Sequence, residues 1–281
     1  MNPIGNGFYL VVGLACVSLF WSSTRSGWEN PFAVRAKQAA VLLAAVAILA
    51  GLYFTLTRSV WIATGIVVAT IIGTRIPRSN RPSVAIAGVL VGCSFLALNW
   101  ERLQSFKRDQ HVSAYEMSQS AGLRPVLASV AWKMFLDRPL LGCGLGQYKQ
   151  VDGDYLRDPN SDLPLERARP YNQHNTFLAL LTETGLLGVG LFVAIGLFWT
   201  VDAWKLWNCG APSAHQLAIV YFAVLLTYFV NGMLHDVTVI PMVHMLLFAL
   251  AGMCRGLVAA DHTRTSPSSF EINARQLNPA T

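Results

Sequence analysis

Apolar and polar residues follow one another along this chain in long blocks, and the apolar blocks predict membrane-spanning helices. Crossing the hydrocarbon core of a bilayer takes roughly 17–25 mostly apolar residues, and seven blocks reach or approach that length. The predicted spans cover residues 3–22, 39–55, 60–72, 84–100, 177–200, 217–229 with their flanks, and 239–258. The pattern therefore predicts an all-α, polytopic transmembrane helix bundle of about seven spans with one long, partly helical external loop.

These spans divide the chain into four parts. Residues 1–100 carry the first four helices, residues 101–175 form the long loop, and residues 176–258 carry the last three helices. Residues 259–281 are a tail rich in Ser, Pro and Asn, which we expect to be mobile. Within the loop, residues 123–136 have helical spacing, which predicts an amphipathic helix that lies on the membrane surface or caps the bundle.

Composition and charge placement agree with a membrane protein. The chain is 53% hydrophobic and only 13% charged, which excludes an ordinary soluble domain. Most basic residues in short loops fall on one side of the predicted topology, and this asymmetry identifies that side as cytoplasmic. The positive net charge is therefore explained by membrane topology rather than by a nucleic-acid partner. These residues are Arg25, Arg35, Lys37, Arg75, Arg78, Arg81, Lys205 and Arg255. The N-terminus, Arg58 and the long loop are then predicted to face outward.

The most suggestive polar residues lie where the long loop meets the fifth predicted span. His174 and Asn175 directly precede the apolar run 177–200, so they are expected at the water–lipid boundary. His174 is a candidate general base or phosphate partner, because histidine titrates near neutral pH. The alternative is that His174 only leads into the helix, with Asn175 or Thr176 as its N-cap.

Two arginines are candidates for binding an anion. Arg58 lies at the outer end of a span after a tight turn, where it either anchors the helix at the interface or binds a lipid phosphate or diphosphate. Arg124 begins the amphipathic segment and is by itself an ordinary solvated arginine. His235, Asp236 and His244 lie near the outer ends of the last two spans, where they line the same external cavity or are simply polar residues of the membrane edge.

Three further features are weaker. Asp152-Gly153-Asp154 matches the DxD pattern of some metal-dependent glycosyltransferases, but three residues in an acidic loop are little evidence. The run GCGLG at 142–146 lacks the preceding strand and following helix of a dinucleotide site. Glu183 lies in a predicted span, about half a turn out of phase with His174, and needs a partner that the pattern does not identify. The five cysteines form no CxxC pair, so neither a zinc site nor a disulfide framework is indicated.

Three patches together resemble the O-antigen ligase family of bacterial inner-membrane proteins. The first is the helix start LTRSVW at 56–61, which is similar to the family's S-R-G-x-W but departs from it at Ser59 and Val60, where glycine usually follows the arginine. The second is Arg124 and Trp132 followed by the run DRPLLGCGLGQY at 137–148, which resembles R…W…D-x-P-x-x-G-x-G-x-G-x-[FY]. The third is HNTFL at 174–178 with ETGLLG at 183–188, which resembles H-N-x-x-L…E-x-G-x-x-G.

The resemblance implies transfer of a glycan from an undecaprenyl diphosphate carrier to an acceptor such as lipid A-core, on the periplasmic side of the inner membrane. By the same resemblance, Arg58 and Arg124 hold the diphosphate, and His174 assists the acceptor hydroxyl or stabilises the leaving group. Asn175 and Tyr148 are expected to contact substrate as well. The family chemistry implies neither a metal nor a cofactor, and membrane lipids are the other expected partners.

Several alternatives remain open at this point. Family members usually have about twelve spans, and the additional spans are expected to be N-terminal. The alternatives are that these spans are absent, encoded upstream of a misplaced start, or supplied by another chain. An O-antigen or exopolysaccharide polymerase uses the same donor, and protein-glycosylating ligases carry similar motifs. A non-catalytic subunit or fragment that only binds lipid-linked glycan is a further alternative. A transporter is disfavoured, because the polar residues gather at the outer face and form no relay through the midplane.

Overall fold

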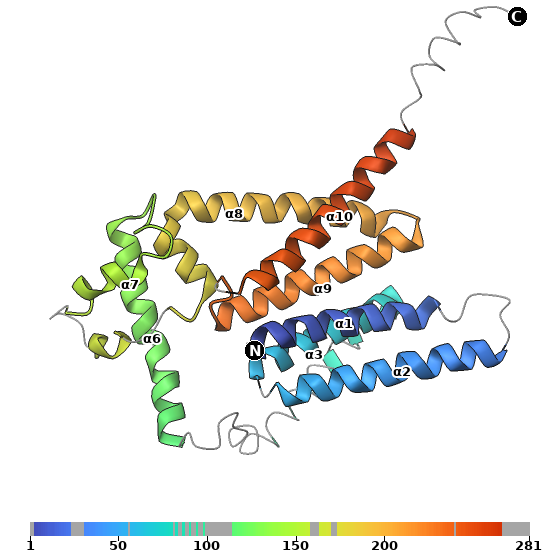
Figure 1. The fold of residues 1–281 in the computed structure, drawn as a ribbon, viewed down its shortest axis with the longest axis horizontal. Helices are drawn as coiled ribbons and strands as arrows, with labels where there is room; N and C mark the ends of the chain where they lie inside the picture. Colours follow the sequence, from blue (N-terminus) through green and yellow to red (C-terminus); the bar gives the residue numbers. More distant parts are fainter. Residues whose placement is uncertain are drawn as a thin grey trace, which may run out of the picture.

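A computed structural model describes residues 3–23, 31–55, 57–80, 114–157, 163–169, 173–238 and 240–265, with scattered residues between 82 and 98. The described residues form helices and connecting turns without strands, which confirms the predicted all-α class (Figure 1). The longer helices are α1 (Pro3–Ser23), α2 (Pro31–Phe54), α3 (Arg58–Arg75), α6 (Ala114–Asp137), α8 (Thr176–Asn208), α9 (Pro212–Leu234) and α10 (Pro241–Thr265). Short helices are η1 (Arg78–Asn80), α7 (Tyr148–Val151), η2 (Asp152–Asp154) and η3 (Leu165–Ala168).

Four of the described helices are long and apolar enough to cross a membrane. These are α2, α8, α9 and the part Pro241–Asp261 of α10, and two shorter apolar stretches, Ile4–Val17 and Arg58–Thr74, lie in α1 and α3. The predicted fourth span, 84–100, falls mostly outside the described residues. The architecture is therefore a polytopic helix bundle of the kind that the hydrophobic pattern predicts.

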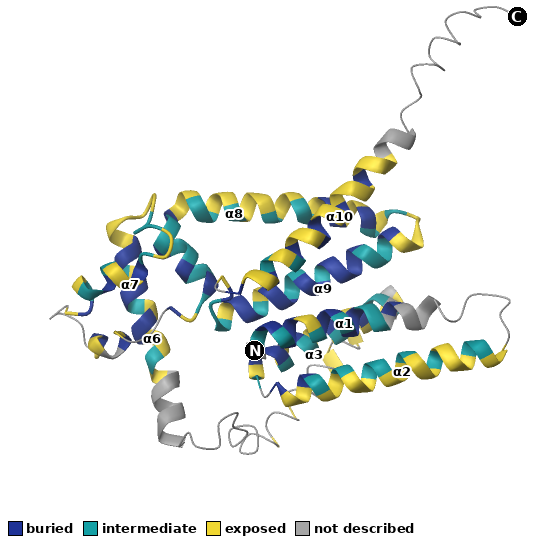
Figure 2. Ribbon diagram, in the orientation of Figure 1, coloured by how far each residue is buried: buried dark blue, intermediate teal, exposed yellow. Residues whose placement is uncertain are grey.

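Helix α9 lies at the centre of the bundle, and α1, α3, α8 and α10 pack around it. Its side chains Tyr221 and Val224 are fully buried in a core that also includes Phe8 of α1. Figure 2 shows α9 largely buried and α2, at the edge, largely exposed. Helices α1 and α3 approach closely at Gly7, where an added Cβ would lie 2.5 Å from the Val60 side chain.

Several helix ends meet at one end of the bundle, which we call the loop end. The Tyr9 hydroxyl of α1 donates to the Met242 carbonyl of α10 at 2.8 Å, and Thr176 at the start of α8 contacts His235 at the end of α9. The start of α3 joins them through the contact between Gly7 and Val60. Polar residues from helices far apart in sequence are therefore gathered at the loop end.

Three helices extend at least seven residues beyond one end of the predicted spans. Helix α2 begins at Pro31, so Arg35 and Lys37, expected in a loop, lie in its first two turns. Proline is well tolerated in the first helical turn, and arginine and lysine are good helix formers, so the helix starts ahead of its apolar run. Helix α8 continues past residue 200 to Asn208, and α10 continues past 258 to Thr265; the rest of the predicted mobile tail lies outside the described residues.

The long loop has a small hydrophobic core of its own. The predicted amphipathic helix is confirmed as part of the longer α6, and its apolar face carries Val126, Leu127, Val130 and Met134. These side chains pack against Tyr148, Leu156, Leu165 and Ala168 from later parts of the loop. The loop's own segments and Leu178 of α8 therefore cover this face, and the expectation that the helix lies on the membrane surface or caps the bundle stays a prediction.

Candidate active site

The residue that starts α8 also anchors it to the neighbouring helix. Asn175 is the N-cap: its side-chain Oδ1 accepts hydrogen bonds from the backbone N–H groups of Phe177 and Leu178, each at 3.0 Å. Its Nδ2 donates to the Met233 carbonyl of α9 at 3.0 Å. The predicted N-cap is thus confirmed at Asn175. Both the oxygen and the nitrogen of the Asn175 side-chain amide are thus hydrogen-bonded within the protein. Contact between Asn175 and substrate stays a prediction.

Thr176 connects the same junction to the turn between α9 and α10. Its side chain is fully buried, and its Oγ1 accepts from the Val237 backbone N–H at 2.8 Å and donates to the His235 carbonyl at 3.0 Å. One hydroxyl therefore binds the residues on either side of Asp236, which are His235 and Val237, and holds them against the start of α8. His174, directly before this junction, has a positive φ of 50°, a backbone conformation that is uncommon for a residue with a side chain.

Four polar residues from three segments interact electrostatically at this place. Partial desolvation, followed by the positive charge of Arg124 in α6, lowers the pKa of His174, whereas Asp236 opposes the change. Desolvation, Arg124 and His174 lower the pKa of His235 to about 4. Both histidines are therefore neutral near pH 7. The structure brings Arg124 and His174 together with His235 and Asp236, and so favours the alternative in which the last two line the same external site.

Arg58 is the first residue of α3 and lies exposed at the loop end of the bundle. Its position is set by Trp61, whose indole N–H donates to the Leu52 carbonyl at the end of α2 at 2.9 Å. The Trp61 ring also stacks on Tyr53, with 6.0 Å between ring centroids. Helices α2 and α3 are thus joined tightly at the turn that presents Arg58.

Helix α8 is broken near its start, and the loop fills the break. Gly185 has φ 64° and ψ −165°, and Figure 1 shows the sharp bend of α8 beside the loop. Residues 139–146, which we call the docked turn, replace the missing helical hydrogen bonds. Four backbone bonds join the two segments: Cys143 N–H to Thr182 O, Gly144 N–H to Glu183 O, Leu186 N–H to Pro139 O, and Leu187 N–H to Leu140 O.

Two glycines permit this contact. A Cβ on Gly185 would lie 2.4 Å from the Leu140 carbonyl carbon, and a Cβ on Gly142 would lie 2.4 Å from the Glu183 carbonyl carbon. Both residues also have a positive φ, which glycine adopts without steric cost. The glycine of each of the two patterns, D-x-P-x-x-G and E-x-G, therefore lies against the backbone of the other segment.

The docked turn also provides the partner of Glu183 that the sequence pattern did not identify. The Glu183 carboxylate accepts a hydrogen bond from the Gly146 backbone N–H at 2.7 Å. Asp236 lies close enough to interact with the same carboxylate. Glu183 thus links the docked turn to the edge of the site.

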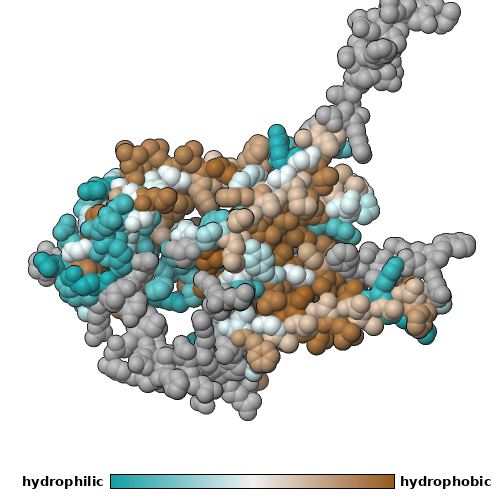
Figure 3. Space-filling view, in the orientation of Figure 1, coloured by the Kyte–Doolittle hydropathy of each residue, from teal (hydrophilic) through white to brown (hydrophobic). Residues whose placement is uncertain are grey.

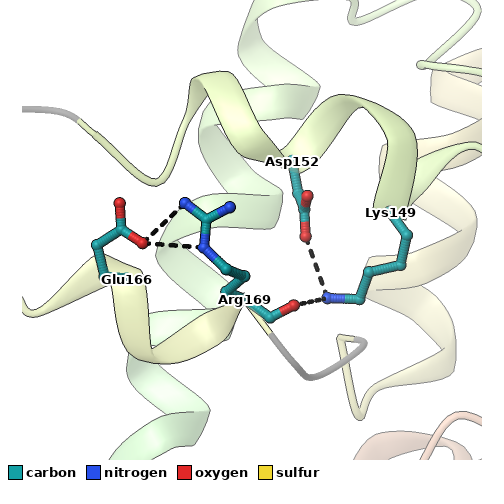
Figure 4. Close-up of polar contacts among 4 residues, drawn as sticks. All are labelled: Lys149, Asp152, Glu166 and Arg169. Carbon is teal, nitrogen blue, oxygen red and sulfur yellow. Dashed lines mark hydrogen bonds and ion pairs between the residues drawn. The ribbon is translucent and has the colours of Figure 1, made fainter.

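Ion pairs and packing hold the rest of the loop together (Figure 4). Lys149 donates to the Asp152 carboxylate at 3.1 Å and to the Arg169 carbonyl at 2.8 Å, and Arg169 pairs with Glu166 at 2.9 Å. Asp152 is therefore buried against a lysine, and within the described ranges no group of three His, Cys, Asp or Glu residues is suited to a metal. Tyr148 is buried in the loop core, so a contact between this residue and substrate stays a prediction.

Comparison with known proteins supplies the family. The sequence model of the O-antigen ligase family matches residues 43–193, more than half of the chain, from α2 through the break in α8. No curated protein matches the chain. The matched region contains Arg58, Arg124 and His174, whereas His235 and Asp236 follow it. The chain therefore belongs to the O-antigen ligase family.

Proposed function

We propose that this protein transfers a glycan from undecaprenyl diphosphate to an acceptor such as lipid A-core, at the periplasmic face of the bacterial inner membrane. The observation that carries the proposal is the grouping of Arg124, His174, His235 and Asp236 at the loop end of a membrane bundle of the O-antigen ligase family. The asymmetry of basic residues supports an outward-facing loop end.

Arginine is suited to the donor of this reaction. Guanidinium groups bind phosphate oxygens through two parallel hydrogen bonds, and a lipid-linked diphosphate lies at the level of the headgroups. In this proposal Arg124 holds the diphosphate beside the histidines, and Arg58, at the same end of the bundle, approaches it from α3. As the diphosphate leaves, these cations stabilise the negative charge that develops on it.

His174 is suited to activate the acceptor. Its lowered pKa keeps the imidazole neutral and able to accept a proton near pH 7. The acceptor hydroxyl attacks the anomeric carbon of the donor sugar, a new C–O bond forms, and the bond from that carbon to the diphosphate oxygen breaks. The hydroxyl proton passes to His174, and Asp236 stabilises the resulting imidazolium. No step calls for a metal ion, because the arginines carry the charge that a metal would otherwise neutralise.

The test is a gel of cell-surface glycans from a deletion strain complemented with wild type, His174→Ala or His215→Ala. His215 is a matched control, because it lies at the start of α9, at the opposite end of the bundle from the site, where its ring packs on Trp207. We expect glycan to stay on the lipid carrier in the deletion strain, and wild type and His215→Ala to restore transfer while His174→Ala does not.

Other outcomes decide against the proposal. Single repeat units on the acceptor, without longer chains, would identify a polymerase instead. An unchanged glycan pattern in the deletion strain would remove the transferase function altogether. Immunoblots of membrane fractions must show equal amounts of each variant, so that loss of transfer is separated from loss of protein.

A further inference from the structure

The docked turn exposes an unusual number of large apolar side chains for a loop. Leu140, Leu141 and Leu145 are 61%, 72% and 77% exposed. Nearby on α6, Leu136 and Trp132 are 57% and 49% exposed. Soluble surfaces rarely gather so many exposed leucines in one place, and such patches usually mark an interaction site.

This apolar surface continues onto the membrane-spanning part of α8. Leu186 and Leu187, whose backbones are hydrogen-bonded to the docked turn, are 51% and 56% exposed, and Leu191 one turn later is 67% exposed. Figure 3 shows hydrophobic side chains over this joint between loop and helix, continuous with those along α8. The leucines of the turn and those of the helix therefore form one surface.

Helix length places this joint at the membrane boundary. At 1.5 Å per residue, the part of α8 from Gly185 to Asn208 is about 36 Å long, which is enough to cross a hydrocarbon core of about 30 Å. The docked turn binds the first residues of that part, so it lies level with the headgroups rather than above them. Trp132 also suits this level, because tryptophan favours the membrane interface.

We infer that the docked turn is inserted into the membrane, with Leu140, Leu141 and Leu145 among the acyl chains next to the headgroups. The occupant of this surface is lipid, because the surface is continuous with the lipid-facing side of α8. Insertion would anchor the loop at the height at which a lipid-linked substrate presents its polar group. This inference concerns contact with the bilayer and is independent of the reaction proposed above.

The test measures the surroundings of single cysteines in lipid nanodiscs. In a background whose native cysteines are replaced by alanine, Leu141→Cys and Leu145→Cys are labelled with bimane, and fluorescence quenching by iodide in water is compared with quenching by doxyl-labelled phospholipid. Gln150→Cys is the matched control, because Gln150 is an exposed polar position a few residues along the same loop. Leu191→Cys on α8 is the reference for a lipid-facing position.

We expect positions 141 and 145 to behave like position 191, with quenching by doxyl lipid several-fold stronger than quenching by iodide, and position 150 to show the reverse. Iodide quenching at 141 and 145 that equals the value at 150 would overturn the inference. Weak quenching by both agents would also overturn it, because the turn would then be covered by protein. Having two positions in the turn keeps the test decisive if one variant does not fold.

Discussion

Replacing Thr176 by valine removes one hydroxyl and keeps the shape of the side chain. That hydroxyl accepts from the Val237 N–H at 2.8 Å and donates to the His235 carbonyl at 3.0 Å, so it holds the turn that carries His235 and Asp236. Thr176 is fully buried, and water does not take the place of the lost group. The variant therefore leaves the Val237 N–H buried without an acceptor.

The expected cost follows from these two bonds. A buried backbone N–H without a partner costs about 1–3 kcal/mol, and the partly buried His235 carbonyl adds less, so we expect a loss of about 2–3 kcal/mol. For a chain of this size the loss corresponds to a decrease of about 4–8 °C in the unfolding midpoint. Release of the turn also moves His235 and Asp236 relative to His174, and misplacement by about 1 Å can slow a reaction roughly a hundredfold.

Tryptophan fluorescence during heating, in detergent, gives the midpoint, and glycan transfer in membranes gives the activity. Thr176→Ser is the control, because it keeps the hydroxyl and loses only a methyl group; it should remain within about 1 kcal/mol of wild type. A Thr176→Val protein that matches wild type in both midpoint and transfer would refute the reasoning, because the hydroxyl would then not hold the turn.

Four other changes have definite expected outcomes. Arg58→Lys should reduce transfer despite its retained charge, because an ammonium lacks the two-pronged geometry of guanidinium; full activity would argue against a diphosphate ligand. Gly185→Ala should lower the unfolding midpoint, because φ is 64° and the new Cβ would lie 2.4 Å from the backbone of the docked turn. Gly190→Ala is the control and should leave the midpoint unchanged, because the space around Gly190 is open. On acidification, transfer should be lost only below pH 6.5, because the neutral form of His174 is the base and its pKa is lowered from 6.5. Asp236→Asn should shift this loss to still lower pH, because Asp236 raises the pKa of His174. Treatment with EDTA should leave transfer intact. Abolition of transfer by EDTA, with rescue by Mn²⁺, would instead support metal binding by Asp152 and Asp154.

The sequence predicted the parts of the fold that depend on local pattern. Apolar run length identified the helices, and the polar-to-apolar change at Asn175 identified the start of α8, because an N-cap acts within three residues. His174 was singled out by its position before a predicted span and Arg124 by its resemblance to a family motif, and the fold brings them together. Helix ends were less predictable, because α2 begins eight residues before its apolar run.

Contacts between distant segments were beyond the reach of the pattern. The break at Gly185 follows the polar residues Thr182, Glu183 and Thr184 within the apolar run, but polar residues and a glycine inside a helical pattern do not by themselves predict a break. The partner of Glu183 is the backbone of Gly146, 37 residues away, and a backbone N–H has no sequence signature. The same reasoning applies to Thr176, whose hydroxyl looks like an ordinary helix start until α9 and α10 are in place.

The break in α8 makes the first two turns of this helix a rigid strut between the loop and the bundle. One end is fixed to the α9–α10 turn by Asn175 and Thr176, and the other end is fixed to the docked turn by backbone hydrogen bonds. Exchange of loops between members of the family should therefore succeed only when both halves of the joint, residues 139–146 and 182–187, are transferred together. A graft that takes one half without the other would carry the loop residues of the proposed site but leave them misaligned with the bundle.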